Sequence, residues 1–235
     1  GDASSILNQL LSHLTDDVEC SAEDSWQNQV AETRASCRAQ LRTNIGPYAQ
    51  ICDAVRSVLP RNAQLVRDIT IPNSAWGNRL LDVYDPATNI YPRGGGIGQA
   101  VGLGIGAAVA HSDRRTMVLI GDGGFQIQVG ELSTIAQEQL PITIIVFDDG
   151  GYGVLRNMQD QHLGRRAGVD LFTPSMQSLA EAHALPYWRV EDANDFHEAF
   201  AAATALPGPS LVHVDCDAIG PMPVPFTPPV HIPSR

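Results

Sequence analysis

The sequence predicts an α/β fold, doubly wound, in which helices cover both faces of a mainly parallel sheet. Four short apolar runs are typical of strands, at 63–67, 116–120, 142–147 and 210–214. Segments with helical periodicity separate these runs, and strands that are apolar throughout are typical of a parallel sheet buried on both faces. With 235 residues and 43% hydrophobic content, the chain is long enough to bury one sizeable core.

The order of these elements divides the chain into three parts. Residues 1–44 are expected to be the end of a preceding domain plus a linker, because a helix-like piece, SSILNQLLSHL, precedes the polar, acidic stretch TDDVECSAEDSW. Residues 45–216 hold the alternation of strands and helices. Residues 217–235 are rich in proline, which excludes a regular helix, so we expect an extended tail over the surface.

Composition excludes several classes of function. All 15 basic residues are arginine, so no lysine can form a Schiff base or serve a phosphate-binding P-loop. The net charge of -11 argues against nucleic acid and anionic membranes as partners. The run at 101–110 is too short to span a bilayer, and the N-terminus shows no secretory leader, which favours a cytoplasmic protein. The cysteines lack a CxxC pair and are predicted to be reduced and buried: Cys20, Cys37, Cys52 and Cys216.

Two predicted strands end in an acid beside glycines. The strand TMVLI is followed by GDGG, which contains Asp122, and the strand ITIIVF is followed by DDGGYG, which contains Asp149. In a parallel sheet both ends lie at the same edge, so the two carboxylates can face one hard cation such as Mg2+. A helix expected to begin near Gly123 and to run through ELSTIAQEQL would attract phosphate at its N-terminus. Each motif alone is more often a glycine turn with a capping aspartate, and only the pair favours a site.

A third glycine-rich motif, RGGGIGQAVGLGIGAA at 93–108, precedes the strand that ends in GDGG. By itself it indicates a helix of small residues that packs closely against a sheet. Its glycines do not follow a strand in the GxGxxG pattern, so a dinucleotide site is set aside.

Together the three motifs resemble those of thiamine-diphosphate-dependent enzymes of the acetolactate synthase, benzoylformate decarboxylase and pyruvate decarboxylase type. That family carries GDG and, roughly 25 to 30 residues later, a metal-binding turn that contains asparagine, a spacing of one helix and one strand. The resemblance covers residues 45–215. It implies the diphosphate-binding fold that is the last of three domains in such chains, with thiamine diphosphate and Mg2+ as cofactors.

The resemblance also implies roles for five residues at the two strand ends. Asp122 and Asp149 would ligate Mg2+ through their side chains, and Gly151 through its carbonyl oxygen. The backbone amides of Gly123 and Gly124 would hold the diphosphate. Most relatives carry asparagine where this chain has Asp149, so we expect cofactor binding to depend unusually strongly on the metal, which must offset two acids and the phosphates.

Five more residues are implied for the rest of the cofactor and for the substrate. The Gly95 carbonyl would accept a hydrogen bond from the aminopyrimidine, Ile97 would wedge beneath the bent cofactor, and Tyr152 belongs to the same cofactor-binding turn. Val154 and Met158 would line a substrate pocket of moderate width, although both are equally compatible with an ordinary helix core. The helix after the glycine motif has Gly102 where relatives commonly have proline.

The activity implied is that of an enzyme acting on 2-oxo acids, most like acetolactate synthase, in which decarboxylation is followed by ligation to a second carbonyl compound. A non-ligating decarboxylase of the benzoylformate decarboxylase type is the first alternative. The second is a cofactor-binding module that is inactive without a partner domain.

In this family a glutamate on a pyrimidine-binding domain activates the cofactor, and the resemblance implies that this domain belongs to the same or a partner chain. Glu131 and Glu138 are better explained as acids on a helix surface. We therefore expect either a fragment or a split enzyme, and a homodimer or homotetramer for the intact protein. His162 and His231 are candidates for a proton donor near the strand ends, although surface histidines are common.

Overall fold

The computed structural model describes residues 2–13 and 24–229. The chain divides into two units, residues 1–39 and residues 40–235. The first unit contains helix α1 (Ala3–His13) and most of helix α2 (Asp24–Ile45), whose last turns belong to the second unit. Most of the expected acidic linker, including Cys20, lies outside the described residues, and a preceding domain for 1–44 stays a prediction.

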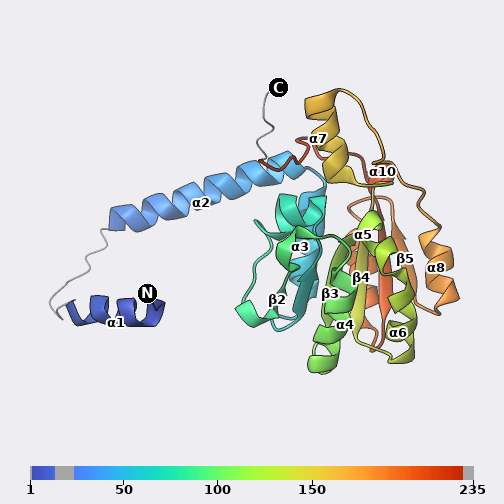
Figure 1. The fold of residues 1–235 in the computed structure, drawn as a ribbon, viewed down its shortest axis with the longest axis horizontal. Helices are drawn as coiled ribbons and strands as arrows, with labels where there is room; N and C mark the ends of the chain where they lie inside the picture. The colour runs from blue at the N-terminus through green and yellow to red at the C-terminus, as the bar shows by residue number, and fades with distance from the viewer. Residues whose placement is uncertain (1, 14–23, 230–235) are drawn as a thin grey trace. The chain divides into compact units, whose positions relative to one another are not determined.

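The second unit is built on a six-stranded sheet in the order β2-β1-β3-β4-β6-β5, and every neighbouring pair is parallel (Figure 1). The longest pairings join β3, β4 and β6 at the centre of the sheet. The strands are β1 (Gln64–Arg67), β2 (Asn89–Ile90), β3 (Thr116–Gly121), β4 (Ile142–Asp148), β5 (Tyr187–Val190) and β6 (Ser210–Asp215). The predicted α/β fold with a parallel sheet is confirmed.

All four predicted strands are present as β1, β3, β4 and β6, but two edge strands were not predicted. Strand β2 has two residues, too few for a periodic signal. Strand β5, with the sequence YWRV, is only partly buried, so it lacks the continuous apolar run by which a central strand is detected. The sequence therefore predicted the buried middle of the sheet and missed its rims.

Helices cover the sheet on both faces, as predicted (Figure 1). Helices α3 and α9 pack on the face to which Met117 and Leu119 of β3 point, and helices α4, α5, α6 and α8 pack on the face of Val118 and Ile120. This follows from the alternation of side chains along a strand. The helix bounds are α3 (Tyr48–Val58), α4 (Ala100–Ala110), α5 (Asp122–Ile127), α6 (Leu132–Gln137), α7 (Gly153–Leu163), α8 (Met176–Ala182), α9 (Phe196–Ala205) and α10 (Cys216–Ile219).

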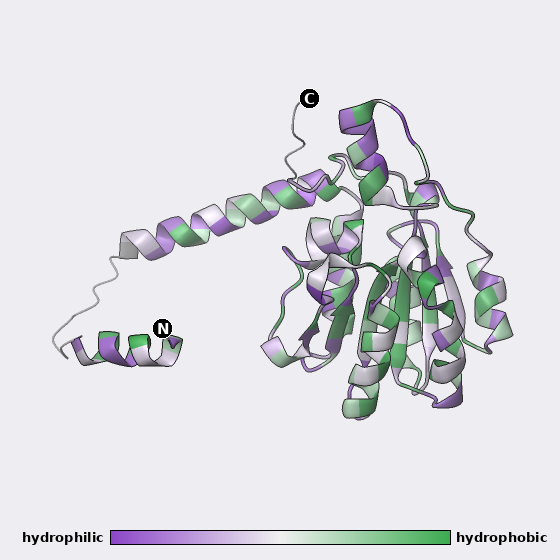
Figure 2. Ribbon diagram, viewed as in Figure 1, coloured by the Kyte–Doolittle hydropathy of each residue, from purple (hydrophilic) through white to green (hydrophobic). Residues whose placement is uncertain are grey.

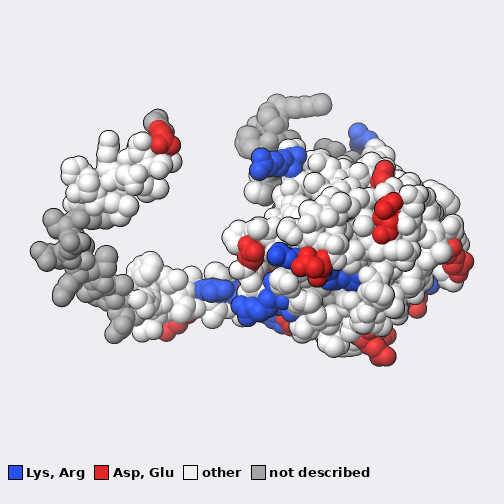
Figure 3. Space-filling model, turned by 90° about the horizontal axis from the view of Figure 1, so that it is seen from below, with Lys and Arg blue, Asp and Glu red and all other residues white. Residues whose placement is uncertain are grey.

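Hydropathy follows this layering. The central strands are mostly hydrophobic along their whole length, whereas the outer helices mix both kinds of residue (Figure 2). Acidic side chains are scattered over the face shown in Figure 3, and several lie directly beside arginines. None of the helices in the described part of the chain has the length and apolar character needed to cross a membrane.

Three local expectations were wrong. The helix after GDGG does not continue to residue 140: α5 ends at Ile127, and a 3-10 turn at Val129–Glu131 separates it from α6. The segment after residue 216 begins with the short helix α10, which crosses the expected start of the tail. Cys37 is exposed, whereas Cys52 is buried and Cys216 is partly buried.

Candidate active site

The carboxyl edge of the sheet carries an aspartate at the end of four adjacent strands. Asp68 follows β1, Asp122 follows β3, Asp148 ends β4 and Asp215 ends β6. Because parallel strands end at the same edge, residues far apart in the sequence meet there, which is where α/β sheets bind ligands. Four acids at one edge make it strongly negative unless cations offset them.

A cavity of about 790 Å³ opens at this edge. Its walls include the ends of β3 and β4, the start of α7 and the segment from Cys216 to Phe226. All eight residues predicted to bind the cofactor line it: Gly95, Ile97, Asp122, Gly123, Gly124, Asp149, Gly151 and Tyr152. The structure therefore brings the three glycine motifs together around one space.

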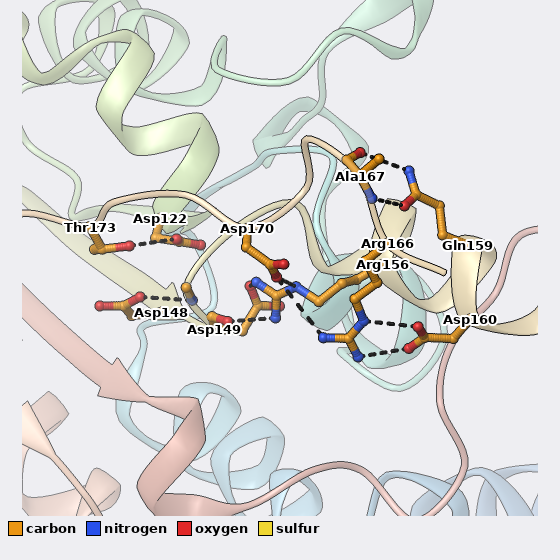
Figure 4. Close-up of polar contacts among 11 residues, drawn as sticks. Asp122, Asp148, Asp149, Arg156, Gln159, Asp160, Arg166, Ala167, Asp170 and Thr173 are labelled. Carbon is orange, nitrogen blue, oxygen red and sulfur yellow. Dashed lines mark hydrogen bonds and ion pairs between the residues drawn. The ribbon is translucent and has the colours of Figure 1, made fainter. Parts of the chain in front are cut away.

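Asp122 is the most deeply buried acid of the cavity, with 1% of its surface exposed. It opens helix α5, and the Thr173 hydroxyl donates a hydrogen bond to its Oδ2 at 3.2 Å (Figure 4). Burial, together with the nearby charges of Asp149 and Asp148, raises the pKa of Asp122 to about 7. A carboxyl in this environment favours either a proton or a cation partner.

The turn after β4 is fixed by main-chain contacts with the segment that follows α7. The Tyr152 amide donates to the Val169 carbonyl at 2.8 Å, and the Leu171 amide donates to the Gly150 carbonyl at 3.0 Å. At Gly151 no side chain fits, because a Cβ atom would overlap the Val169 carbonyl oxygen. The glycine is therefore required by the close approach of two backbone segments.

Asp149 lies in this turn with its carboxylate largely buried. Its Oδ1 atom has no hydrogen-bond partner among the described residues, although Nη2 of Arg156 lies 3.8 Å away. Burial raises the pKa of Asp149 to about 6, and the Arg156 guanidinium acts in the opposite direction. An unsatisfied buried oxygen beside a second acid is suited to a metal ligand.

Asp68 holds the glycine motif against the strand ends, a contact that the sequence did not predict. Its Oδ2 accepts a hydrogen bond from the Gly98 amide at 2.7 Å, and its Oδ1 accepts one from the Ile69 amide at 2.9 Å. A Cβ atom at Gly124 would lie 2.6 Å from Asp68 Oδ2. Gly124 is therefore required by close packing against a carboxylate, a role separate from any contact with phosphate.

Gly123 is also closely packed. A Cβ atom at this position would lie 2.9 Å from the Tyr152 ring. Gly123 and Tyr152, predicted as parts of two separate motifs, thus contact each other directly. The two turns that carry Asp122 and Asp149 are held in a fixed relation by this contact.

Asp148, next to Asp149, belongs to a separate chain of polar contacts. Its Oδ2 lies 3.2 Å from Nε2 of His213, and Nδ1 of His213 lies 2.9 Å from the Tyr187 hydroxyl. The other oxygen of Asp148 accepts a hydrogen bond from the Gly150 amide at 3.2 Å. His213 thus helps to fix the turn after β4 through Asp148.

The cavity wall opposite the strand ends comes from α7 and the C-terminal segment. Val154 lines the cavity, but Met158, one turn further along α7, is not among the lining residues. Met222, Pro225 and Phe226 are lining residues that the sequence did not indicate. His162 lies on α7 and is exposed, and His231 lies outside the described residues.

The C-terminal segment is tied to the second unit by main-chain and side-chain hydrogen bonds. The Tyr48 hydroxyl donates to the Gly220 carbonyl at 2.9 Å, and the Val224 amide donates to the Asn44 carbonyl at 3.0 Å. The side-chain amide of Asn157 donates to the Phe226 carbonyl at 2.9 Å. Met222 and Phe226 pack partly buried against the core, so the tail forms one side of the cavity.

We expect Asn157→Ala to loosen this wall. Loss of one neutral hydrogen bond should lower the free energy of unfolding by about 1 kcal/mol and make the segment after Gly220 more accessible to protease. Limited proteolysis with mass analysis of the C-terminal fragments measures the change. Gln177→Ala, which removes an exposed side-chain contact with Glu181, is the control and should leave the cleavage rate unchanged.

Asp68 could have been found from the sequence, because it follows an apolar run in the same way as Asp122 and Asp149 do. Thr173 and Arg156 gave no such signal, since their contacts depend on how the segment after α7 folds back. In the described part of the chain no three His, Cys, Asp or Glu side chains are grouped to hold a metal ion. Protein carboxylates alone would therefore not complete the coordination of a metal ion at this edge.

Curated relatives match this chain over most of its length. The chain is 28% identical over 224 residues to the acetolactate synthase large subunit of Pyropia yezoensis, which covers 92% of this chain and 37% of that protein. It is 27% identical over 219 residues to the probable 2-ketoarginine decarboxylase AruI of Pseudomonas aeruginosa, covering 91% and 38%. The chain thus spans less than half the length of these curated relatives.

Solved structures show the same fold. The thiamine diphosphate-dependent 4-hydroxybenzoylformate decarboxylase of Rhodococcus jostii RHA1 superposes with a TM-score of 0.65 and 31% identity, over 71% of this chain and 32% of that one. Residues 72–214 match the family described as thiamine pyrophosphate enzyme, C-terminal TPP binding domain. Since this match covers more than half of the chain, the chain belongs to the thiamine pyrophosphate enzymes and carries their C-terminal TPP binding domain.

Proposed function

We propose that the chain is the diphosphate-binding half of an enzyme that acts on 2-oxo acids, most like acetolactate synthase. The observation that carries the proposal is that Asp122, Asp149 and Gly151 line one cavity with Gly95 and Ile97, inside the segment that matches the family. The thiamine diphosphate named by the family would supply a carbon nucleophile for the oxo carbon and an electron sink for the pair released when the carboxylate leaves as carbon dioxide.

The donor atoms at the strand ends fit Mg2+. Asp122 and Asp149 offer carboxylate oxygens, one of which lacks a hydrogen bond, and Gly151 offers a carbonyl oxygen. Mg2+ prefers such hard ligands and takes its remaining ligands from water and substrate phosphates, so a site with two protein carboxylates suits it. In the proposal Gly123 and Gly124 would hold the diphosphate through their amides.

The other lining residues would orient the organic part of the cofactor and the substrate. The Gly95 carbonyl would accept a hydrogen bond from the aminopyrimidine, and Ile97 would support the ring system from below. Val154 would face the substrate, and the apolar side chains of Met222 and Phe226 would exclude water from the same space. Met158 would act only by supporting α7, because it does not line the cavity.

Two alternative functions are each supported by a specific observation. The likeness to the 4-hydroxybenzoylformate decarboxylase, at 31% identity, favours a decarboxylase that does not ligate. The share of about 37% of the acetolactate synthase subunit favours a module that needs a pyrimidine-binding domain of the same or a partner chain, with its glutamate. A homodimer or homotetramer for the intact protein stays a prediction.

Calorimetric titration tests the cofactor proposal. Thiamine diphosphate should bind to the chain in the presence of Mg2+ and at least tenfold more weakly in EDTA. Asp122→Asn should weaken binding, whereas Asp160→Asn, an exposed acid on α7 paired with Arg166, should not. Equal affinity with and without Mg2+ would contradict the metal assignment.

Product analysis separates the functions. With a pyrimidine-binding domain added, pyruvate should give acetolactate if the enzyme ligates, and benzoylformate should give benzaldehyde if it is a decarboxylase. Cofactor binding without turnover of either substrate in that mixture would favour the inactive module.

A further inference from the structure

Arg156, on the first turn of α7, is held between the turn after β4 and the segment that follows α7. Its Nη1 donates a hydrogen bond to the Asp149 carbonyl at 2.7 Å, and its Nη2 lies 3.8 Å from Asp149 Oδ1. Its Nε lies 3.0 Å from Asp170 Oδ1. Figure 4 shows the guanidinium between the two aspartates. The side chain is only 14% exposed, so these contacts are poorly screened by water.

The two neighbouring acids of this turn have different partners. Asp148 lies beside His213, whose Nε2 is 3.2 Å from its carboxylate. For Asp149, Arg156 is the cation within ion-pair distance among the described residues. An arginine stays charged at every physiological pH, so Arg156 offsets the charge of Asp149 permanently. A turn with asparagine in place of Asp149 would have no such charge to offset.

We propose that Arg156 is a positioning residue that serves as the built-in counter-cation of Asp149 and fixes the turn that carries it. This rests on the proposed function, in which Asp149 ligates Mg2+. The same pairing makes Arg156 a competitor of any cation that binds Asp149, because both are attracted by one carboxylate. Because Arg156 already neutralises Asp149, a cation that binds at Asp149 gains less there and therefore stabilises the folded chain less.

A double-mutant cycle in EDTA tests the pairing by thermal unfolding of the 235-residue chain. Arg156→Gln should lower the unfolding midpoint by about 4 to 8 °C, because it leaves a largely buried carboxylate without its cation. In an Asp149→Asn background the same change should cost less than half as much. Arg189→Gln, which removes an arginine that is 51% exposed from its pair with Asp215, is the matched control and should shift the midpoint by less than about 2 °C.

Adding Mg2+ with thiamine diphosphate gives the second measurement. The rise in midpoint should be larger for Arg156→Gln than for wild type, since the added cation takes over the charge of Asp149. In the Asp149→Asn background Arg156→Gln should leave the rise unchanged. A structural role of Arg156 in helix packing alone would lower the midpoint equally in both backgrounds and leave the rise unchanged, and either result would overturn the proposal.

Arg156→Lys keeps the positive charge but loses the planar guanidinium with its several donors. Its unfolding midpoint in EDTA should therefore fall between those of wild type and Arg156→Gln. A lysine variant as unstable as the glutamine variant would overturn the counter-cation role. The measurements in EDTA and those with Mg2+ and thiamine diphosphate also separate the pairing of Arg156 from the proposed function. A wild-type chain that gains nothing from Mg2+ and thiamine diphosphate would contradict the proposed function, while the cycle in EDTA would still report on the pairing.

Discussion

Gly151→Ala is expected to lower the free energy of unfolding by about 2 to 4 kcal/mol, because overpacking against a fixed backbone is among the costliest single changes. The added Cβ would overlap the Val169 carbonyl oxygen and would lie 2.6 Å from Arg156 Nη2 and 3.2 Å from Asp170 Cα. The backbone has little freedom to move away, since Gly151 pairs with Asp170 in an antiparallel bridge. Urea denaturation followed by circular dichroism measures the change.

Gly106→Ala is the matched control for this prediction. Gly106 lies within α4, and a Cβ atom there would meet nothing within 4 Å. Alanine should therefore stabilise the chain by up to about 1 kcal/mol through helix propensity. If Gly151→Ala lost less than about 0.5 kcal/mol, the segment at 168–171 would have to be free to move, against the contacts described above.

The second large effect is a fall in stability as pH rises. In EDTA the chain should be less stable at pH 8 than at pH 5, because burial raises the pKa of Asp122 to about 7 from an ordinary value of 3.8. The native state then binds more protons than the unfolded state between these two values, so the stabilisation is complete below pH 3.8 and is lost as pH rises through 7. A shift of this size corresponds to at most about 4 kcal/mol.

Asp122→Asn should remove the larger part of this pH dependence, since an amide does not titrate, and the smaller part that comes from Asp149, with its pKa raised to about 6, should remain. Asp160→Asn should keep the wild-type dependence, because Arg166 holds the pKa of that exposed carboxyl below its usual range and outside the window from pH 5 to 8. Urea denaturation at a series of pH values measures both. With Mg2+ and thiamine diphosphate present, the gain in stability should be larger at pH 8, where the carboxylates are ionised. A flat wild-type profile would show that Asp122 is better solvated than its burial indicates.

The structure modifies the expectation that a metal ion alone offsets the two acids. Arg156 lies within ion-pair distance of Asp149. Part of the extra negative charge that Asp149 brings in place of asparagine is thus balanced inside the chain. The strong metal dependence predicted from the sequence should therefore appear fully only when Arg156 is replaced.

The sequence predicted correctly those features that have one strong local cause. Val118 and Ile120 lie in an apolar run that only a buried strand explains, and GDGG follows it in the position expected for a site at the sheet edge. The prediction was incomplete at the two-residue strand β2 and at the partly buried strand β5, and wrong for the continuous helix after GDGG. The two edge strands depend on packing at the rim of the sheet, where periodicity is weak.

For the cavity, the eight residues predicted from the family motifs all line it, but their closest neighbours were not foreseen. Asp68 contacts Gly98, Thr173 contacts Asp122 and Arg156 contacts Asp149 across 30, 51 and 7 positions of the chain. Residue spacing gives no signal for such pairs, because the distances are set by how the strand ends and the segment after α7 meet.

The sequence by itself determined the parallel α/β fold, the three glycine motifs and the two acids at the strand ends, because each follows from local periodicity or from a residue type that only one backbone geometry accepts. Only the tertiary structure decided which charges face one another and which walls close the cavity. Those depend on the sheet order that places β1, β3, β4 and β6 side by side, and on burial, which turns an ordinary aspartate at position 122 into a group with a pKa of about 7.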